Sequence, residues 1–447
     1  MDKGFIVAID LGTSKITGVL GRKNEQGVTS ILASESIPSD SCIKYGVIYN
    51  INEVAGKIKK LVSLLENKIG KKIGKAYVSI SGRSLRAMEH VETKLLDGPT
   101  PVNFAMLDAM EQQAKLNKPE FLTNYSVLAP EYYLDGKYEE DPIDKTASAI
   151  EGHYRLIIGR PNIKASIIKS LTEKAQLEIA GFVVGPVASA ALVLDEHDRQ
   201  LGCALVDFGG GTTTLSIYKG GLLRYMTVIP FGGRTITKDV QELGFVFDSA
   251  ETYKIRYGKL GKDKNKSLAD LTPEVDLKEL NKVIQLRQDE IMLNVINQIK
   301  ESGYADQLEA GILVMGGASQ MNGLVDYLSE KAQMPVKRAI PKRVYINNAA
   351  ELLQNPAYTQ ALSLMLFANE NCEKQETPKV AETEPVQQVV QEQQPQNNPP
   401  ANSPLEEDIK EEKKQKKGKE KDSRQTSFFS FFEKIQNFGG TMFKDEE

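Results

Sequence analysis

The fold is decided by IVAIDLGTSK at residues 6–15 and by its echo ALVDFGGGTT at residues 204–213. In each copy an apolar run ends in an aspartate and is followed by glycine and hydroxyl residues. Apolar runs of four to six residues with β-branched members are typical of buried strands. Each copy therefore predicts a strand, a tight glycine turn and a second strand. Their separation of about 200 residues indicates a duplicated domain.

A third glycine turn, GILVMGGAS at residues 311–319, ends another predicted strand. After Asn322, apolar residues recur at helical spacing up to Ala332, which predicts a helix there. Further helices are expected at residues 52–68, 104–116, 163–179, 235–243 and 277–301. This alternation of strands and helices is typical of an α/β protein.

The three turns suit a nucleoside triphosphate. Glycine lets backbone N–H groups approach phosphate oxygens closely, and threonine or serine hydroxyls add further donors. Magnesium takes one or two carboxylates, usually together with water. Two facing hairpins would hold the phosphates from both sides, with Asp10 and Asp207 near the metal and Lys15 adding positive charge. The alternative is that each hairpin is only a turn, since Asp and Gly are favoured in turns for conformational reasons.

Other functional classes lack support in the sequence. There is no Gly-x4-Gly-Lys-Ser/Thr motif, and no G-x-G-x-x-G opens a helix near the first strand. The net charge of −4 over 447 residues gives no nucleic-acid signature, so no nucleic-acid partner is expected. The three histidines and three cysteines lack metal-ligand spacing. The first residues are not typical of a signal peptide, and no window reaches the roughly 18 apolar residues of a membrane-spanning helix.

The composition changes sharply near Cys372. Residues 373–426 are rich in Glu, Gln, Pro, Asn and Lys, and we expect a disordered linker because they bury too little apolar surface to offset their ordering entropy. Residues 427–443 predict an amphipathic helix lying in a membrane interface, helped by basic residues at 410–424. The alternative is a helix that docks in a protein groove. The proposed membrane-facing residues are Phe428, Phe431, Phe432, Ile435, Phe438 and Met442.

The three turns, in this order, resemble the actin, Hsp70 and sugar-kinase superfamily. The resemblance implies an actin-like fold of duplicated ribonuclease-H-like domains that close on ATP and Mg²⁺. Residues 10–15 and 207–213 are similar to its two phosphate loops, and residues 315–319 to its adenosine motif. The nucleotide contacts that it implies are Asp10, Gly12, Thr13, Ser14, Lys15, Asp207, Gly209, Gly210, Gly211, Thr212, Thr213, Gly316, Gly317 and Ala318.

Within the superfamily, the chain resembles the FtsA family of bacterial cell-division proteins over residues 4–370 and the tail. AETYKIRYG at residues 250–258 is similar to a helix of that family in which Glu251 and Lys254 would face the ribose. The implied divisions are subdomain IA at 1–84, 161–196 and 346–372; an inserted subdomain IC at 85–160; IIA at 197–224 and 309–345; IIB at 225–308; the linker at 373–426; and the membrane-targeting helix at 427–443.

The family resemblance implies a protein that polymerises with copies of itself and anchors filaments of the tubulin-like protein FtsZ. The anchoring would take place on the cytoplasmic side of the inner membrane, at the division septum, where later division proteins are recruited. The acidic C-terminal peptide of FtsZ would bind residues 225–308, with Lys282 and Arg287 as candidate contacts. The alternative is that both are ordinary exposed helix charges.

The sequence departs from the superfamily at Gly185-Pro186. Many relatives have an acidic or amide residue there, which orients the water that attacks the γ-phosphate. Ser363 also stands where the second connecting helix usually has glycine. We therefore expect ATP binding with weak or absent hydrolysis, and assign no catalytic residue. The alternatives are an Hsp70-like ATPase or small-molecule kinase, which would need a substrate base near the cleft, and a pilus-assembly protein, which would lack the Phe-rich tail.

Overall fold

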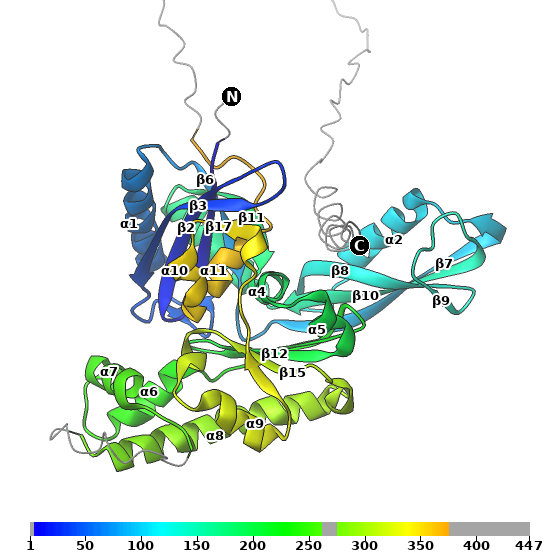
Figure 1. The fold of residues 1–447 in the computed structure, drawn as a ribbon. Coiled ribbons are helices and arrows are strands. Elements are labelled where there is room, and N and C mark those ends of the chain that lie inside the picture. The colour runs from blue at the N-terminus through cyan, green and yellow to red at the C-terminus, as the bar shows by residue number, and fades with distance from the viewer. Residues whose placement is uncertain (1–3, 262–274, 375–447) are drawn as a thin grey trace, which may run out of the picture. The chain divides into compact units, whose positions relative to one another are not determined.

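Two sheets of the computed structural model repeat one scheme, and the structure describes residues 4–261 and 275–374 (Figure 1). The first sheet has the order β11 (Glu178–Val184), β6 (Lys75–Ile80), β1 (Ile6–Leu11), β2 (Lys15–Lys23), β3 (Thr29–Pro38) and β17 (Ile346–Asn347). The second has the order β14 (Leu222–Ile229), β13 (Thr213–Lys219), β12 (Cys203–Phe208), β15 (Gly311–Met315) and β16 (Val336–Arg338). A short hairpin pairs β4 (Ile43–Lys44) with β5 (Val47–Ile48).

The register of the two central hairpins is equivalent. Asp10 on β1 is opposite Thr17, and Asp207 on β12 is opposite Thr214. Each aspartate strand also has a parallel neighbour, β6 for β1 and β15 for β12. Both aspartates therefore lie at the carboxyl ends of parallel strands, the edge where α/β sheets bind ligands. The duplicated α/β fold predicted from the sequence is confirmed.

Helices cover both sheets. In α1 (Ile51–Ile69), the side chain of Asn50 accepts a hydrogen bond from the Glu53 amide at the start, and Gly70 ends the helix with a φ of 68°. The first sheet is also accompanied by α3 (Asn162–Ile168), α4 (Gly185–Val193), α10 (Ala350–Gln354) and α11 (Thr359–Leu364). Against the core of the second sheet pack α6 (Gly233–Gln241), α7 (Phe247–Tyr257), α8 (Leu277–Glu301) and α9 (Leu324–Ala332), while α5 (Glu196–Leu201) precedes β12.

The helices predicted within the described residues are present, and one of them was predicted too long. The expected helix over residues 163–179 is α3 followed by a π-helical turn, η1 (Lys169–Lys174). Gln176 then adopts a φ of 60°, which ends the helical path, and β11 begins at Glu178. An isolated left-handed residue leaves little trace in the hydrophobic pattern, because that pattern reflects side-chain burial and not the backbone angles of a single residue.

The segment of the chain that follows β6 and precedes α3 forms a third sheet. Its order is β7 (Arg86–Pro101), β10 (Thr146–Gly159), β8 (Thr123–Leu134) and β9 (Lys137–Glu139), and all its pairings are antiparallel. The helix α2 (Phe104–Leu116) packs on it through Met110 and Ala114. Glu131 on β8 accepts hydrogen bonds from both terminal nitrogens of Arg224 on β14, so the third sheet is tied to the second.

Several predictions concern residues that the structure does not describe. The tail helix at 427–443, with Phe428, Phe431, Phe432, Ile435, Phe438 and Met442, lies outside the described residues, as does the linker from 375 onward. Residues 373 and 374 were predicted to belong to that linker, but the Lys374 amide donates to the carbonyl of Lys72 at 2.9 Å, so they pack on the described fold. None of the described helices is long and apolar enough to cross a bilayer. The subdomain boundaries stay predictions.

Candidate functional site

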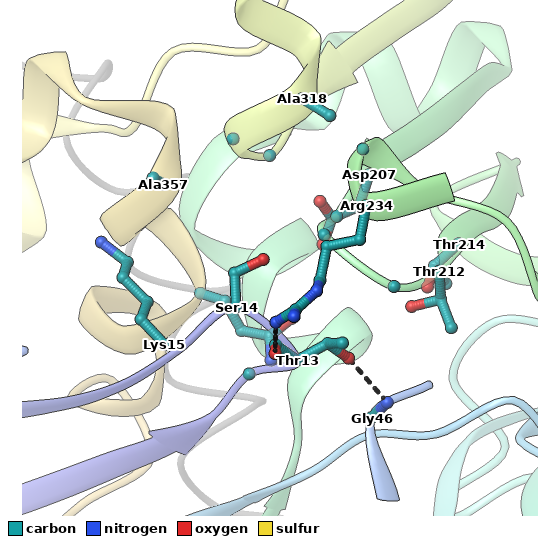
Figure 2. Close-up of a pocket in the computed structure, with 18 of the residues that line it drawn as sticks. Thr13, Ser14, Lys15, Gly46, Asp207, Thr212, Thr214, Arg234, Ala318 and Ala357 are labelled. Carbon is teal, nitrogen blue, oxygen red and sulfur yellow. Dashed lines mark hydrogen bonds between the residues drawn. The ribbon is translucent and has the colours of Figure 1, made fainter. Parts of the chain in front are cut away.

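The tips of the two central hairpins touch each other. A Cβ atom on Gly210 would lie 2.0 Å from Ser14 Oγ, and one on Gly211 would lie 2.6 Å from Thr13 Oγ1. A larger residue at either position would have to displace the Thr13 or Ser14 side chain, so glycine favours this close approach between the second loop and the first. Thr13 Oγ1 also accepts a hydrogen bond of 3.0 Å from the Gly46 amide, which fixes the first loop (Figure 2).

The second loop is held by backbone packing from two sides. The amides of Gly233 and Arg234, at the start of α6, donate to the carbonyls of Gly209 and Gly210 at 3.0 and 2.7 Å. On the other side Gly316 has a φ of 87°, and a Cβ atom there would lie 2.1 Å from Asp207 Oδ1. The third glycine turn is thus in contact with the aspartate of the second hairpin, and glycine is required for this contact.

These elements enclose a cavity of about 420 Å³, within the range of small-molecule sites (Figure 2). Its wall contains all but one of the residues proposed as nucleotide contacts. The predicted residues that line it are Asp10, Gly12, Thr13, Ser14, Lys15, Asp207, Gly209, Gly210, Gly211, Thr212, Glu251, Lys254, Gly316, Gly317 and Ala318.

The exception is Thr213, which was predicted to contact the nucleotide. Its side chain is fully buried, and its hydroxyl donates a 2.9 Å hydrogen bond to the carbonyl of Phe231. Thr214, the next residue along β13, lines the cavity instead. Successive side chains of a strand point to opposite faces, so an error of one residue exchanges the lining residue for a core residue.

Several lining residues were missed by the sequence analysis, among them Ser81, Arg234 and Gln360. Arg234 follows the Gly232-Gly233 pair, and its guanidinium reaches the first hairpin. It donates to the carbonyl of Thr13 at 3.1 Å (Figure 2). It also donates to Ser41 Oγ at 3.2 Å. The glycine pair after a strand was a usable signal for Arg234, whereas no local motif marks Ser81 or Gln360.

Lys15 lies at one side of the cavity and contacts an aromatic ring. Its ammonium is 3.4 Å from the centroid of the Tyr358 ring, and in Figure 2 it points toward Ala357 and away from Arg234. Burial lowers the pKa of Lys15, while Tyr358 and Asp10 raise it. The contribution of this charge to phosphate binding stays a prediction.

The two aspartates differ in how their charge is supported. Burial raises the pKa of Asp10, but hydrogen bonds from Ser79 and Gln360 and the charge of Lys15 lower it. Burial also raises the pKa of Asp207, to about 7, and the charge of Asp10 adds to the effect. A divalent cation near both carboxylates would stabilise their charged forms, and carboxylates are the ligands that Mg²⁺ prefers. The donor set therefore fits a magnesium ion, which would neutralise phosphate charge when bound.

Glu251 and Lys254, one turn apart on α7, form a partly buried pair beside the cavity. Lys254 Nζ donates to Glu251 Oε2 at 2.7 Å, to Thr237 Oγ1 at 2.9 Å and to the carbonyl of Gly233 at 3.0 Å. Burial lowers the pKa of Lys254, and Glu251 raises it. This lysine therefore ties α7 to the start of α6, and the ribose contact proposed for the pair stays a prediction.

The two candidate partner residues both lie on α8 but differ in their surroundings. Arg287 pairs with Asp239 on α6 and with Glu290, and these carboxylates raise its pKa. Lys282 is exposed. Neither residue lines the cavity. The positive charge of Arg287 is largely neutralised by its neighbours, so Lys282 is the more available of the two for an acidic partner.

Comparison with known proteins places these features in a family. Residues 204–363 match the family model of the cell division protein FtsA. The chain is 31% identical over 329 residues to the cell division protein FtsA of Porphyromonas gingivalis, covering 70% of this chain and 68% of that protein. It is 29% identical over 378 residues to the Pseudomonas aeruginosa cell division protein FtsA, covering 81% of this chain and 89% of that protein.

A solved structure confirms the fold class independently. The chain superposes on a component of the PilM–PilN type IV pilus biogenesis complex with a TM-score of 0.57 and 17% sequence identity. The alignment covers 81% of this chain and 98% of that one. At this identity the likeness shows the actin-like fold alone.

Proposed function

Because the chain belongs to the FtsA family, its role is in cell division, and we propose that it is an ATP-binding adaptor that anchors FtsZ filaments to the membrane. It polymerises through its actin-like body and acts at the septum, on the cytoplasmic face of the inner membrane. Later division proteins are recruited to the same assembly. The observation that carries the proposal is the cavity between the two glycine hairpins, with one aspartate at the end of each.

The binding of Mg·ATP rests on the composition of that cavity. Its second loop offers the backbone amides of Gly210 and Gly211, since the Gly209 amide donates to the Thr212 carbonyl at 2.9 Å. Its first loop adds the hydroxyls of Thr13 and Ser14. Amides presented by glycine-rich turns and flanked by hydroxyls are suited to phosphate oxygens. The buried carboxylates of Asp10 and Asp207 would hold the magnesium ion that accompanies the phosphates.

Calorimetric titration of the full chain with Mg·ATP tests this site. We expect saturable binding, weakened about tenfold or more in Asp207→Ala because the metal loses a carboxylate. Asp326→Ala, on the exposed side of α9, is the matched control and keeps the wild-type affinity. Equal titration heats for wild type and Asp207→Ala would refute the proposed metal and phosphate site.

Membrane attachment is proposed for the aromatic stripe of the tail. Two aspartates in place of Phe431 and Phe432 are expected to abolish flotation with vesicles that contain anionic lipids, because charge cannot enter the interface at these positions. Asn437→Asp adds a charge off the predicted stripe and leaves flotation largely intact. A double variant that still floats would exclude the tail as the anchor.

Binding of the acidic FtsZ peptide is proposed near Lys282. Lys282→Glu is expected to weaken the capture of this peptide several-fold, more strongly at low salt, because the contact is electrostatic and exposed. Lys300→Glu at the far end of α8 changes the net charge equally and serves as the control. The proposed contact would be wrong if both variants bound the peptide as the wild type does.

A further inference from the structure

The amide of Gln360 occupies the space that the missing side chain of Gly185 leaves free. Gly185 is the first residue of α4, and Gln360 lies on α11. A Cβ atom on Gly185 would lie 2.7 Å from Gln360 Nε2, 2.8 Å from its Cδ and 2.9 Å from Ser81 Oγ. Any side chain at position 185 would therefore displace this amide. The absence of a polar group at Gly185-Pro186 is matched by a polar group that arrives from another helix.

The orientation of the amide is set by its partners. Gln360 Nε2 donates to Asp10 Oδ1 at 2.7 Å and to Ser81 Oγ at 3.0 Å, which uses both of its hydrogens. The opposite orientation would place Oε1 against the Asp10 carboxylate, so it is disfavoured. Among the described residues, no donor to Oε1 is found. Gln360 lines the cavity together with Asp10 and Ser81, so its oxygen remains as an acceptor at the aspartate end of the site.

We propose that Gln360 is the catalytic residue that orients water for slow ATP hydrolysis in this cleft, an inference that rests on the proposed ATP binding. The attacking water donates a hydrogen bond to Oε1. The water oxygen forms a bond to the terminal phosphorus. The bond from that phosphorus to the bridging oxygen breaks, and its electron pair stays on ADP. The water's proton leaves with phosphate or solvent. A neutral amide positions water without accepting its proton, so turnover is slow.

Phosphate release and nucleotide affinity, measured together on the full chain, test this role. Gln360→Ala is expected to release phosphate at about one tenth of the wild-type rate or below. Its affinities for ATP and ADP should stay within threefold of wild type. Gln354→Ala, on the exposed end of α10, is the matched control and keeps the wild-type rate. An unchanged rate in Gln360→Ala would overturn the proposal, as would equal loss of ATP and ADP binding. Wild-type protein that binds ATP but releases no phosphate overturns it too and leaves ATP binding standing, whereas wild-type protein that binds no ATP refutes the proposed function as well.

The contact between the two helices has a test that needs no nucleotide. Gly185→Ala should lower the melting temperature of the nucleotide-free protein, because its methyl group meets the Gln360 amide. In a Gln360→Ala background the same change should have a clearly smaller effect, because only the contact with the rotatable Ser81 hydroxyl remains, so the two effects are non-additive. The rate should follow the same pattern, with Gly185→Ala slowing phosphate release only when Gln360 is present. Additive effects in both measurements would show that Gly185 does not make room for this amide.

Discussion

The two central hairpins share one register but present different chemistry to the cavity. The first loop works through side chains: the hydroxyls of Thr13 and Ser14 lie at its tip, and Lys15 follows. The second loop is three successive glycines at residues 209–211, and its backbone is packed against Gly232, while Gly316 packs against Asp207 and Phe208 just before it. A duplicated scaffold has thus produced one loop that adapts through rotamers and one that is fixed by its backbone.

The aspartates of the two hairpins also differ in how far their surroundings stabilise the charged form. Asp10 has hydrogen bonds from Ser79 and Gln360 and a nearby cation, Lys15, all of which favour its charged form. For Asp207 the pKa is set by burial and by the charge of Asp10, and both raise it. The charged form of Asp207 therefore needs a bound cation for its stabilisation, whereas that of Asp10 is partly stabilised by its protein neighbours.

The largest expected effect is on the pH dependence of the nucleotide-free protein. Asp207 binds a proton more strongly when folded, with a pKa of about 7 against an ordinary value of 3.8. The free energy of unfolding should therefore fall as pH rises between these values and level off above them, by on the order of 4 kcal/mol. Urea denaturation of wild type and Asp207→Asn across this range isolates the effect, because the variant lacks the titrating group.

The control for this experiment is Asp326→Asn, which removes an exposed carboxylate and should follow the wild-type pH course. If Asp207→Asn and wild type responded to pH identically, the asymmetry between the two aspartates would be disproved. Saturating Mg·ATP should also reduce the pH response, since the bound cation stabilises the charged form.

A smaller effect is expected from rigid packing behind the second loop. A Cβ atom on Gly232 would lie 2.6 Å from the Gly209 carbonyl oxygen and 2.8 Å from the Thr212 amide nitrogen, and neither can rotate away. Gly232→Ala should weaken ATP binding by about ten- to hundredfold, corresponding to 1–3 kcal/mol of overpacking. Titration calorimetry measures this loss directly.

Two glycines serve as comparisons. Gly210→Ala meets only the hydroxyl and Cβ of Ser14, a side chain that can rotate, and should lose less affinity than Gly232→Ala. Gly56→Ala, in α1 with nothing near its Cβ position, should bind as wild type. A greater loss in Gly210→Ala than in Gly232→Ala would contradict the contrast between an adaptable and a fixed loop.

The smallest effect concerns the cation of the first loop. Lys15 stacks on Tyr358, and such contacts contribute about 0.5–1 kcal/mol. Tyr358→Leu removes this competitor for the ammonium, so ATP affinity should rise by about two- to fivefold. The gain should disappear when Lys15→Met is added, and fluorescence titration with an ATP analogue measures both variants. Weaker binding in Tyr358→Leu would show that the ring supports the lysine and does not compete for it.

The sequence predicted what is local. Asp10 and Asp207 each lie just before a glycine turn, so the strand, the turn and the aspartate at the strand end follow from neighbouring residues. Thr213 does not line the cavity, whereas Thr214 does, because the strand's alternation, and not the motif, decides which threonine faces it. The helix that overran into β11 was wrong for a comparable reason, since the left-handed Gln176 is a single backbone choice.

What could not be predicted comes from distant parts of the chain. Gln360 reaches Asp10 across a separation of 350 residues, and Arg234 reaches Thr13 across 221. No local motif marks Gln360, and the glycine pair before Arg234 does not say which residue the guanidinium will reach. Each residue becomes part of the site only when two sheets and a connecting helix are assembled. The missing polar group at Gly185 is therefore visible in the sequence, whereas the amide that fills its place is visible only in the fold.

Arg234 has a consequence for how a ligand would come and go. Its guanidinium extends from the α6 side of the cavity to Thr13 and Ser41, so separating the two hairpins at this point breaks both hydrogen bonds. Each contributes about 1 kcal/mol, so an empty cleft already has a bias toward closure. The time that a nucleotide stays bound thereby depends on Arg234, a residue that the nucleotide need not touch. Substitutions of this arginine should change the rates of nucleotide binding and release more than the nucleotide affinity.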